Sequence, residues 1–179
     1  MFLPVLDPRA TRARILAASI ELLTQRGLPG WTVDEVARRA RCAKGLVNYH
    51  FTSKSELLDW SAGDLATLRR EARFEPFSTR SASAALDRLW IVLRDDVDSG
   101  RFAASVALAA SGFPRRRDPT TNALCWAAAQ AFGVPVEALP GDVALFAVLD
   151  GLELQLLAGF NPEAVLEAYH RIWLGLLQT

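Results

Sequence analysis

The amino-acid sequence predicts an all-α protein, and three observations carry this prediction. Leu and Ala are abundant while aliphatic β-branched residues are few, a balance that favours helix. Apolar residues recur at spacings of three and four, the period of an amphipathic helix. Gly, Pro and capping residues stand between these segments, where helices end and begin. With 51% apolar and 22% charged residues, the 179-residue chain has a globular composition, and we expect about nine helices.

The first predicted helix runs from about residue 8 to Arg26. Asp7 can cap its N-terminus, and Pro8 suits the first helical position. Gly27 ends the helix, and a turn over residues 28–30 follows. The predicted buried stripe of this helix consists of Ile15, Leu16, Ser19, Leu22 and Leu23.

A second, short helix is predicted to begin at Val33. Thr32 precedes Glu35 by three residues, so each side chain can cap a backbone N–H group of the other, which is a capping box. Trp31 before the cap and Val36 inside the helix suit a hydrophobic staple. The start of this helix is therefore well specified by local sequence.

A tight turn and a third helix are predicted next. Arg41 and Cys42 allow the turn, and residues 43–50 form the helix. Two short helices joined by a turn of three or four residues, with a cation and hydrogen-bonding side chains on the second, are typical of a helix-turn-helix motif.

The order and spacing of residues in this region resemble a known family. The matching residues are Thr32-Val33 with Ala37, Ala43-Lys44-Gly45, Asn48-Tyr49-His50-Phe51, Ser53-Lys54 with Leu57-Leu58, and upstream Ile15-Leu16, Leu22-Leu23 and Arg26-Gly27. They resemble the DNA-binding segment of the TetR family of one-component bacterial repressors. The resemblance implies a three-helix helix-turn-helix DNA-binding domain over residues 1–53, followed by a helical effector-binding and dimerisation domain over residues 54–179.

The resemblance also implies roles for single residues. Four of them match positions that hold DNA phosphates in the family: Thr32, Tyr49, His50 and Lys54. Lys44 and Asn48 are candidates for base edges, Lys toward guanine acceptors and Asn toward adenine. Gly45 would let the helix approach DNA closely. Val47 could touch a thymine methyl or pack in the core, and we favour the core.

The charge distribution supports a nucleic-acid partner for the N-terminal part alone. Residues 1–52 hold eight Lys and Arg against four Asp and Glu, a net charge of +4, while the remainder holds 12 against 16, a net charge of −4. Attraction to phosphate is electrostatic, so a basic segment on an acidic body fits a protein that touches DNA at one end. A solvated surface with chance asymmetry is the alternative.

The rest of the chain predicts a long connecting helix and then five more helices. Ser53 and Glu56 form a second capping box, so a helix begins at Lys54 and runs to about Phe74. Such a helix spans roughly 30 Å and can act as a lever between the domains. The later helices are expected at about residues 84–97, 101–112, 120–132, 143–158 and 162–177.

The last two predicted helices are too apolar to be buried easily within one chain. Asp142 is expected to cap the first of them, in which Asp150, Glu153 and Gln155 are the only polar residues. Packing of both helices against their symmetry mates as a four-helix bundle would cover this surface and give a homodimer. The predicted interface contains Leu149, Leu152, Leu154, Leu156, Val165, Tyr169, Ile172, Trp173 and Leu176.

The family resemblance implies a small-molecule effector, and aromatic residues with a few polar anchors could line its pocket. Core packing is the alternative for any single aromatic residue. The predicted pocket residues are Trp90, Arg94, Phe102, Phe113, Asn122, Trp126, Gln130, Phe146 and Asp150. The function implied is a repressor that binds a palindromic DNA operator as a homodimer and is released by the effector. A helix-turn-helix module that binds protein, or a regulator without a ligand, is the alternative.

Other classes of protein are disfavoured by the sequence. His50 and His170 are its only histidines, and no phosphate-binding Gly loop, nucleophile elbow or paired metal ligands occur, so we expect neither an enzyme nor a cofactor or metal. Cys42 and Cys125 are expected to stay reduced. No apolar run reaches the roughly 18 residues of a membrane span, and a cytoplasmic location is expected.

Overall fold

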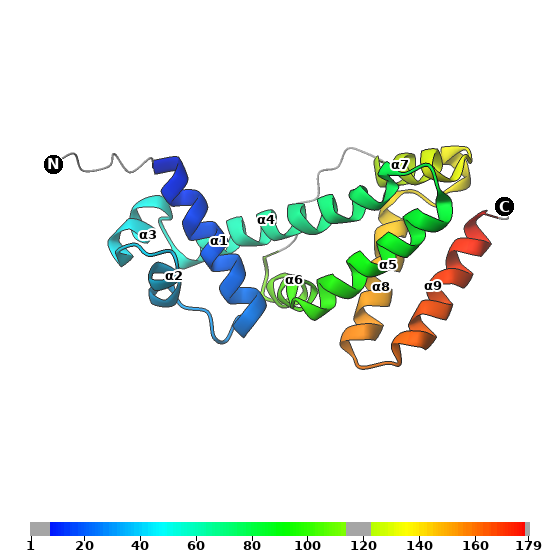
Figure 1. Ribbon diagram of the computed structural model, residues 1–179. Helices are drawn as coiled ribbons and strands as arrows, with labels where there is room; N and C mark the ends of the chain where they lie inside the picture. Colours follow the sequence, from blue (N-terminus) through cyan, green and yellow to red (C-terminus); the bar gives the residue numbers. More distant parts are fainter. Residues whose placement is uncertain (1–7, 114–122, 178–179) are drawn as a thin grey trace. The chain divides into compact units, whose positions relative to one another are not determined.

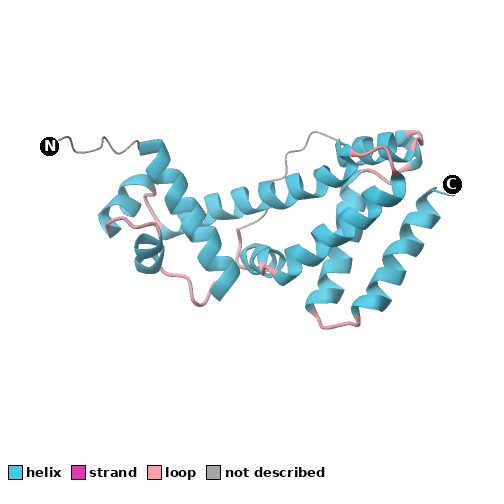
Figure 2. Ribbon diagram, viewed as in Figure 1, coloured by secondary structure: helices cyan, strands magenta, loops and turns pink. Residues whose placement is uncertain are grey.

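The computed structural model describes residues 8–113 and 123–177, and their regular elements are helices, as predicted (Figure 1). Figure 2 shows helices and loops without strands over the described residues. The helices are α1 (Pro8–Arg26), α2 (Val33–Arg39), α3 (Lys44–His50), α4 (Lys54–Phe74), α5 (Ala82–Asp98), α6 (Arg101–Ala110), α7 (Ala123–Phe132), α8 (Asp142–Leu157) and α9 (Pro162–Leu177), with short 3-10 helices η1 (Glu75–Ser78) and η2 (Val136–Ala138). None of the described helices is long and apolar enough to cross a membrane.

The described residues pack as two compact units. Unit 1 contains the described residues up to Thr67 together with residues 99–113, and unit 2 contains residues 68–98 and 123–177. The boundary therefore falls inside α4, and α6 belongs to the unit of the N-terminal helices. The functional domain boundary between residues 53 and 54 stays a prediction.

The end of α6 differs from the predicted end at residue 112. Gly112 adopts a left-handed conformation with φ +86°, and Phe113 N–H donates to the Leu108 carbonyl at 3.0 Å. Gly112 N–H also donates to the Ala109 carbonyl at 3.2 Å, which completes a Schellman motif. This motif ends the helix at Ala110 and fixes the backbone position of Phe113.

The expected role of Asp142 as the cap of its own helix is wrong. Gly141 precedes α8, and Asp142 is the first residue of that helix. Its carboxylate instead accepts hydrogen bonds from Leu124 N–H at 3.2 Å and Cys125 N–H at 2.8 Å, in the first turn of α7. Asp142 thus caps a helix that lies elsewhere in the chain, which no local spacing can indicate.

Each unit has its own apolar core. In unit 1 the predicted stripe of α1 is buried, together with Trp31, Val36, Val47, Phe51, Leu57, Leu58 and Leu65. In unit 2 the largest buried side chains include Leu89, Leu93, Tyr169 and Trp173. Phe132 and Phe77 pack against Trp173 with ring centroids 5.2 and 6.3 Å from it.

Candidate nucleic-acid interface

The start of α2 is fixed by Thr32, as the sequence predicts. Thr32 has extended backbone, and its hydroxyl accepts a hydrogen bond from Glu35 N–H at 3.2 Å. The reciprocal half of the predicted capping box is not used, because the Glu35 carboxylate pairs with Arg26 and Arg38. Two arginines provide a stronger, charge-assisted partner than a backbone N–H group.

Trp31 holds the beginning of α2 against two other helices. Its side chain is buried, and its Nε1–H donates to the hydroxyl of Ser19 on α1 at 2.9 Å. The Ser19 hydroxyl lies 2.7 Å from that of Ser61 on α4, which in turn donates to the Leu57 carbonyl at 2.7 Å. These buried polar groups satisfy one another and set the position of α2 relative to α1 and α4.

The turn between α2 and α3 contains the left-handed residue Arg41. Its φ of +52° is uncommon for a residue other than Gly, and marks the point where the chain reverses. Cys42 N–H donates to the Ala37 carbonyl at 3.0 Å and closes the turn. The next helix, α3, begins at Lys44.

The structure divides the predicted DNA-contacting residues into a solvent face and a core face. The exposed members are Thr32, Lys44, Gly45, Asn48, Tyr49 and Lys54. Tyr49 is 77% exposed, an unusual state for a large aromatic side chain. His50 is half-buried beside it, with ring centroids 5.2 Å apart. Val47 is buried in the core of unit 1, as favoured, and offers no surface to a base.

Lys44 already has a partner in the protein. Its ammonium lies 2.9 Å from the carboxylate of Asp34 on α2, and both side chains are more than half exposed. An ion pair so exposed contributes little to stability, so exchange of Asp34 for a nucleic-acid acceptor costs little. Lys44 is therefore available to a partner molecule at the surface of α3.

Gly45 leaves open space on the surface of α3. A Cβ atom built on this residue meets no atom within 4 Å, so internal packing does not require Gly here. Gly in a helix lowers its stability by about 1 kcal/mol relative to Ala. A close approach by a partner molecule is a physical reason for its presence.

The second capping box positions Lys54 at the start of α4. Ser53 accepts from Glu56 N–H at 3.0 Å, and the Glu56 carboxylate accepts from the backbone N–H and hydroxyl of Thr52. The hydrogen bond from the Thr52 hydroxyl is the main reason that the pKa of Glu56 lies below its ordinary value, and the hydrogen bond from the Thr52 backbone N–H also contributes. The Lys54 ammonium lies 5.4 Å from the centre of the Trp31 ring.

Arg12 is a further cation held in place in unit 1, near the start of α1. Its guanidinium lies 4.2 Å from the Trp60 ring centre and 5.0 Å from that of Phe51. The sequence gives no spacing signal for this contact, which joins α1 to α4. Stacking on two rings restricts the side chain in a way that a solvated arginine is not restricted.

The residues of the predicted effector pocket are distributed over both units, and the pocket stays a prediction. Phe102 and Phe113 belong to unit 1, and Phe102 is buried in its interior. Asn122 lies outside the described residues. The others belong to unit 2 and are Trp90, Arg94, Trp126, Gln130, Phe146 and Asp150. Trp126 and Gln130 are exposed, and Trp90 packs against Tyr169 with ring centroids 5.5 Å apart.

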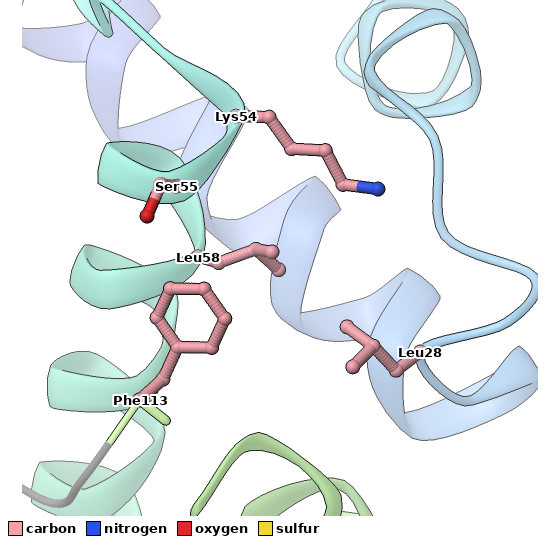
Figure 3. A pocket seen from close by; sticks show the side chains of 5 residues that line it. All are labelled: Leu28, Lys54, Ser55, Leu58 and Phe113. Carbon is pink, nitrogen blue, oxygen red and sulfur yellow. The ribbon is translucent and has the colours of Figure 1, made fainter. Parts of the chain in front are cut away.

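Phe113 does line a pocket, in unit 1. The pocket has a volume of about 390 Å³ and is lined by Leu28, Lys54, Ser55, Leu58 and Phe113. Figure 3 shows Lys54 and Leu58 extending from α4 toward Leu28, with the Phe113 ring beside Leu58. The lining thus brings a predicted effector-pocket residue next to a predicted DNA-contacting residue.

A buried charge cluster, defined as Arg69, Arg73, Asp96, Asp150 and Glu153, lies in unit 2. Both arginines come from α4, and each contacts Glu153 and Asp150 of α8. Arg69 also pairs with Asp96 of α5. Of these five residues, only Asp150 was among the predicted site residues. The available signal was the spacing of the arginines by four residues and of the acids by three, which places each pair on one helix face.

The predicted dimer residues are mostly interior. Five are buried in the core of unit 2: Leu149, Leu152, Val165, Tyr169 and Trp173. Ile172, Leu156 and Leu176 are half-buried, and Leu154 is 51% exposed. Side chains buried within one chain offer no surface to a second copy. The interface stays a prediction. The exposed apolar residues that a second copy could contact near the ends of α8 and α9 are Leu154 and, outside the predicted set, Leu157, Phe160 and Leu174.

Comparison with known proteins supports the prediction that unit 1 contains a helix-turn-helix DNA-binding segment. Residues 15–59 match the family model described as "Bacterial regulatory proteins, tetR family". The chain is 38% identical over 52 residues to the uncharacterized HTH-type transcriptional regulator TtgW of Pseudomonas putida, which covers 29% of this chain and 39% of TtgW. It is 33% identical over 100 residues to the HTH-type transcriptional regulator BetI of Burkholderia mallei, which covers 53% of this chain and 48% of BetI.

The chain spans less than half the length of these two curated relatives. Solved structures extend the similarity over most of the fold. A TetR-family member from Streptomyces coelicolor A3 is 27% identical, and the match covers 90% of this chain and 96% of the S. coelicolor chain with a TM-score of 0.56. The multidrug binding protein EbrR complexed with ethidium is 25% identical, with the same coverage and TM-score. The predicted fold class is confirmed, and the named relatives are regulators rather than enzymes.

Proposed function

Because the chain belongs to the tetR family of bacterial regulatory proteins, we propose that it is a ligand-responsive repressor that binds a palindromic operator as a homodimer. The observation that carries the proposal is the solvent face of α3, where Lys44, Asn48 and Tyr49 are exposed while Val47 is anchored in the core. A helix held in this way can enter the major groove without rearrangement. A cytoplasmic location belongs to the same proposal, since bacterial DNA lies there.

In the proposed complex, contacts divide into those that position the protein and those that read sequence. Thr32, Tyr49 and Lys54 would hold phosphates, because hydroxyl and ammonium groups there face solvent. Lys44, released from Asp34, and Asn48 would contact base edges in the groove. Two such faces related by a twofold axis would read two inverted half-sites.

Response to an effector is supported by the relatives. EbrR is a multidrug binding protein whose structure holds ethidium, so a similar fold binds a small molecule. In this chain, effector binding would shift the population toward a form whose two DNA-binding units no longer match the operator. The dimer would then leave the operator.

The first test is the salt dependence of DNA binding. Selection of bound fragments from genomic DNA provides the operator, and its affinity is then measured over a salt series. We expect Lys54→Ala to lower the slope of log affinity against log salt by about two, since each of two protomers loses one phosphate contact at about 0.9 per contact. Lys44→Ala should weaken binding and relax base preference at one position of each half-site.

The control for this test is Arg80→Ala, which removes an exposed cation from unit 2. Its salt slope should equal that of the unchanged chain. Unaltered operator affinity of Lys44→Ala and Lys54→Ala at every salt concentration would refute direct operator binding. The alternative function as a protein-binding module would then be favoured.

A second prediction concerns Gly45. Gly45→Ala should raise the stability of the fold by up to about 1 kcal/mol, because Ala favours helix and its Cβ meets no atom within 4 Å. The same change should weaken operator binding, because the methyl group occupies space at the proposed groove. Thermal unfolding and operator titration measure the two effects. Gly63→Ala, at an equally open site on α4, is the control and should leave operator affinity unchanged.

A third prediction concerns the dimer. Leu154→Glu places a charge in the exposed apolar surface of α8 and should convert the dimer to a monomer, with a loss of operator affinity. Analytical ultracentrifugation at micromolar concentration measures the change. Ile91→Glu, at a 64% exposed apolar residue on α5, is the matched control and should remain dimeric. A monomeric unchanged chain would contradict the dimer proposal.

A further inference from the structure

We propose that the pocket lined by Leu28, Leu58 and Phe113 binds an amphipathic carboxylate whose acid group pairs with Lys54 and so competes with DNA for that side chain. The competition rests on the proposed function, which assigns Lys54 to a phosphate. The pocket itself is independent of it. The site lies in unit 1, next to the proposed DNA-binding face.

The apolar part of the site has the size and composition of a small-molecule pocket. Its volume of about 390 Å³ falls within the range of roughly 300–1,000 Å³ that such pockets occupy. Leu28 and Phe113 are only partly buried, while Leu58 beneath them belongs to the core. An occupant would therefore remove apolar surface from water that the folded chain leaves exposed, which favours binding.

The pocket wall is held in place by the helices around it. The Schellman motif at the end of α6 fixes the backbone of Phe113. At the other end of α6, a Cβ atom on Gly100 would lie 2.3 Å from the carbonyl oxygen of Thr24 on α1, so α6 is seated closely against α1. A wall that does not have to be ordered on binding costs the ligand less affinity.

Lys54 sets the charge of the ligand. Among the described residues it has no ion-pair partner, whereas Lys44 pairs with Asp34. The acid nearest in sequence, Glu56, is engaged by Thr52. An ammonium group at the edge of an apolar pocket favours a carboxylate over a neutral group or a cation. An apolar body with one carboxylate satisfies both parts of the site.

Competition for Lys54 couples this pocket to DNA. An ammonium group paired with the ligand's carboxylate cannot also neutralise a phosphate, so each bound ligand removes one phosphate contact from the protomer that binds it. By linkage, the factor by which ligand weakens DNA binding equals the factor by which DNA weakens ligand binding. The ligand would thus weaken operator binding through direct competition at unit 1.

Calorimetric titration of the full chain without DNA tests the pocket, with 4-phenylbutanoate as the probe and 4-phenylbutanamide as its neutral match. We expect Lys54→Gln to weaken binding of the acid by about fivefold and to leave the amide unchanged. Phe113→Ala should weaken both by about tenfold, because both lose the ring contact. Lys44→Gln is the matched control and should bind both probes as the unchanged chain does.

Two results would overturn the pocket: equal affinity of acid and amide in the unchanged chain, or unaltered acid affinity in Lys54→Gln. Because Lys54 is exposed, its substitution tests the site even if Phe113→Ala fails to fold. A chain that binds the operator but neither probe refutes the pocket and leaves the proposed function intact.

The competition is tested by operator titration in saturating 4-phenylbutanoate. The salt slope of the unchanged chain should fall by about two, to the slope of Lys54→Gln, and the probe should not change the slope of Lys54→Gln further. A slope unaffected by bound probe would overturn the competition. A chain that binds the probe as expected but no DNA refutes the proposed function and, with it, the competition.

Discussion

Replacing Arg69 with Met should lower the free energy of unfolding by about 3–5 kcal/mol, the cost of leaving buried charges without a partner. Arg69 is 3% exposed and contacts Asp96, Asp150 and Glu153. Its removal takes from Asp96, Asp150 and Glu153 the guanidinium that all three contact. Met fills a similar volume, so lost packing contributes little to the expected change.

Chemical denaturation measures this effect, and Arg94→Met supplies the matched control. Arg94 is 42% exposed and lies 3.8 Å from Asp98, one helix turn away on α5. Such an exposed pair contributes roughly 0–1 kcal/mol, so its loss should barely move the midpoint. Equal effects of the two substitutions would show that the buried cluster has no special role in stability.

The cluster also bears on how α4 could transmit a signal. Arg69 and Arg73 fasten the C-terminal part of α4 to α5 and α8 within unit 2, while Ser61 and Leu58 of the same helix are buried in unit 1. One continuous helix therefore contributes to the interior of both units. Under the proposed function, a ligand that alters either interior would act on a helix that the other unit shares.

Helices were predictable from the sequence because their signals are local. Spacing of apolar residues and the cap at Ser53 gave α4 its observed bounds, Lys54–Phe74. The burial of Val47 and the exposure of Lys44 and Asn48 on α3 also follow from helical period. These features depend on residues within a few positions of one another.

Features built by residues far apart in the chain were not predictable. Asp142 caps α7, a helix that begins 19 residues before it. Phe113 lines one pocket with Lys54 only because α6 packs with unit 1. The dimer residues show a third case. Helical period identifies an apolar side of α9, but it does not tell whether Trp173 faces its own chain or a second copy.

Raising the pH from about 5 to about 8 should destabilise unit 2, because the folded chain must give up a proton from Glu153. Burial raises the pKa of this carboxyl from 4.5 to about 8, Arg73 and Arg69 oppose the rise, and Asp96 adds to it. The two guanidinium groups and three carboxylates of the cluster carry a net charge of −1 when all are ionised, and one bound proton neutralises it. This charge balance agrees with a raised pKa of Glu153.

The sign follows from proton counts. Between pH 4.5 and 8 the folded chain binds one proton more at Glu153 than the unfolded chain does. The stability that Glu153 contributes is therefore greatest below about pH 4.5 and falls as the pH rises toward 8. The contribution of Glu153 changes by roughly 3–4 kcal/mol between pH 5 and 8. Denaturation midpoints measured across this range report the slope.

Glu153→Gln tests the assignment, because the amide keeps the shape of the protonated carboxyl and cannot release a proton. We expect this variant to be as stable as the unchanged chain near pH 5, more stable near pH 8, and flatter in between. Glu163→Gln, at an exposed carboxylate of α9, should keep the original slope. If Glu153→Gln instead loses stability at every pH, then Glu153 is ionised in the folded state and serves as the anion that neutralises Arg69 and Arg73.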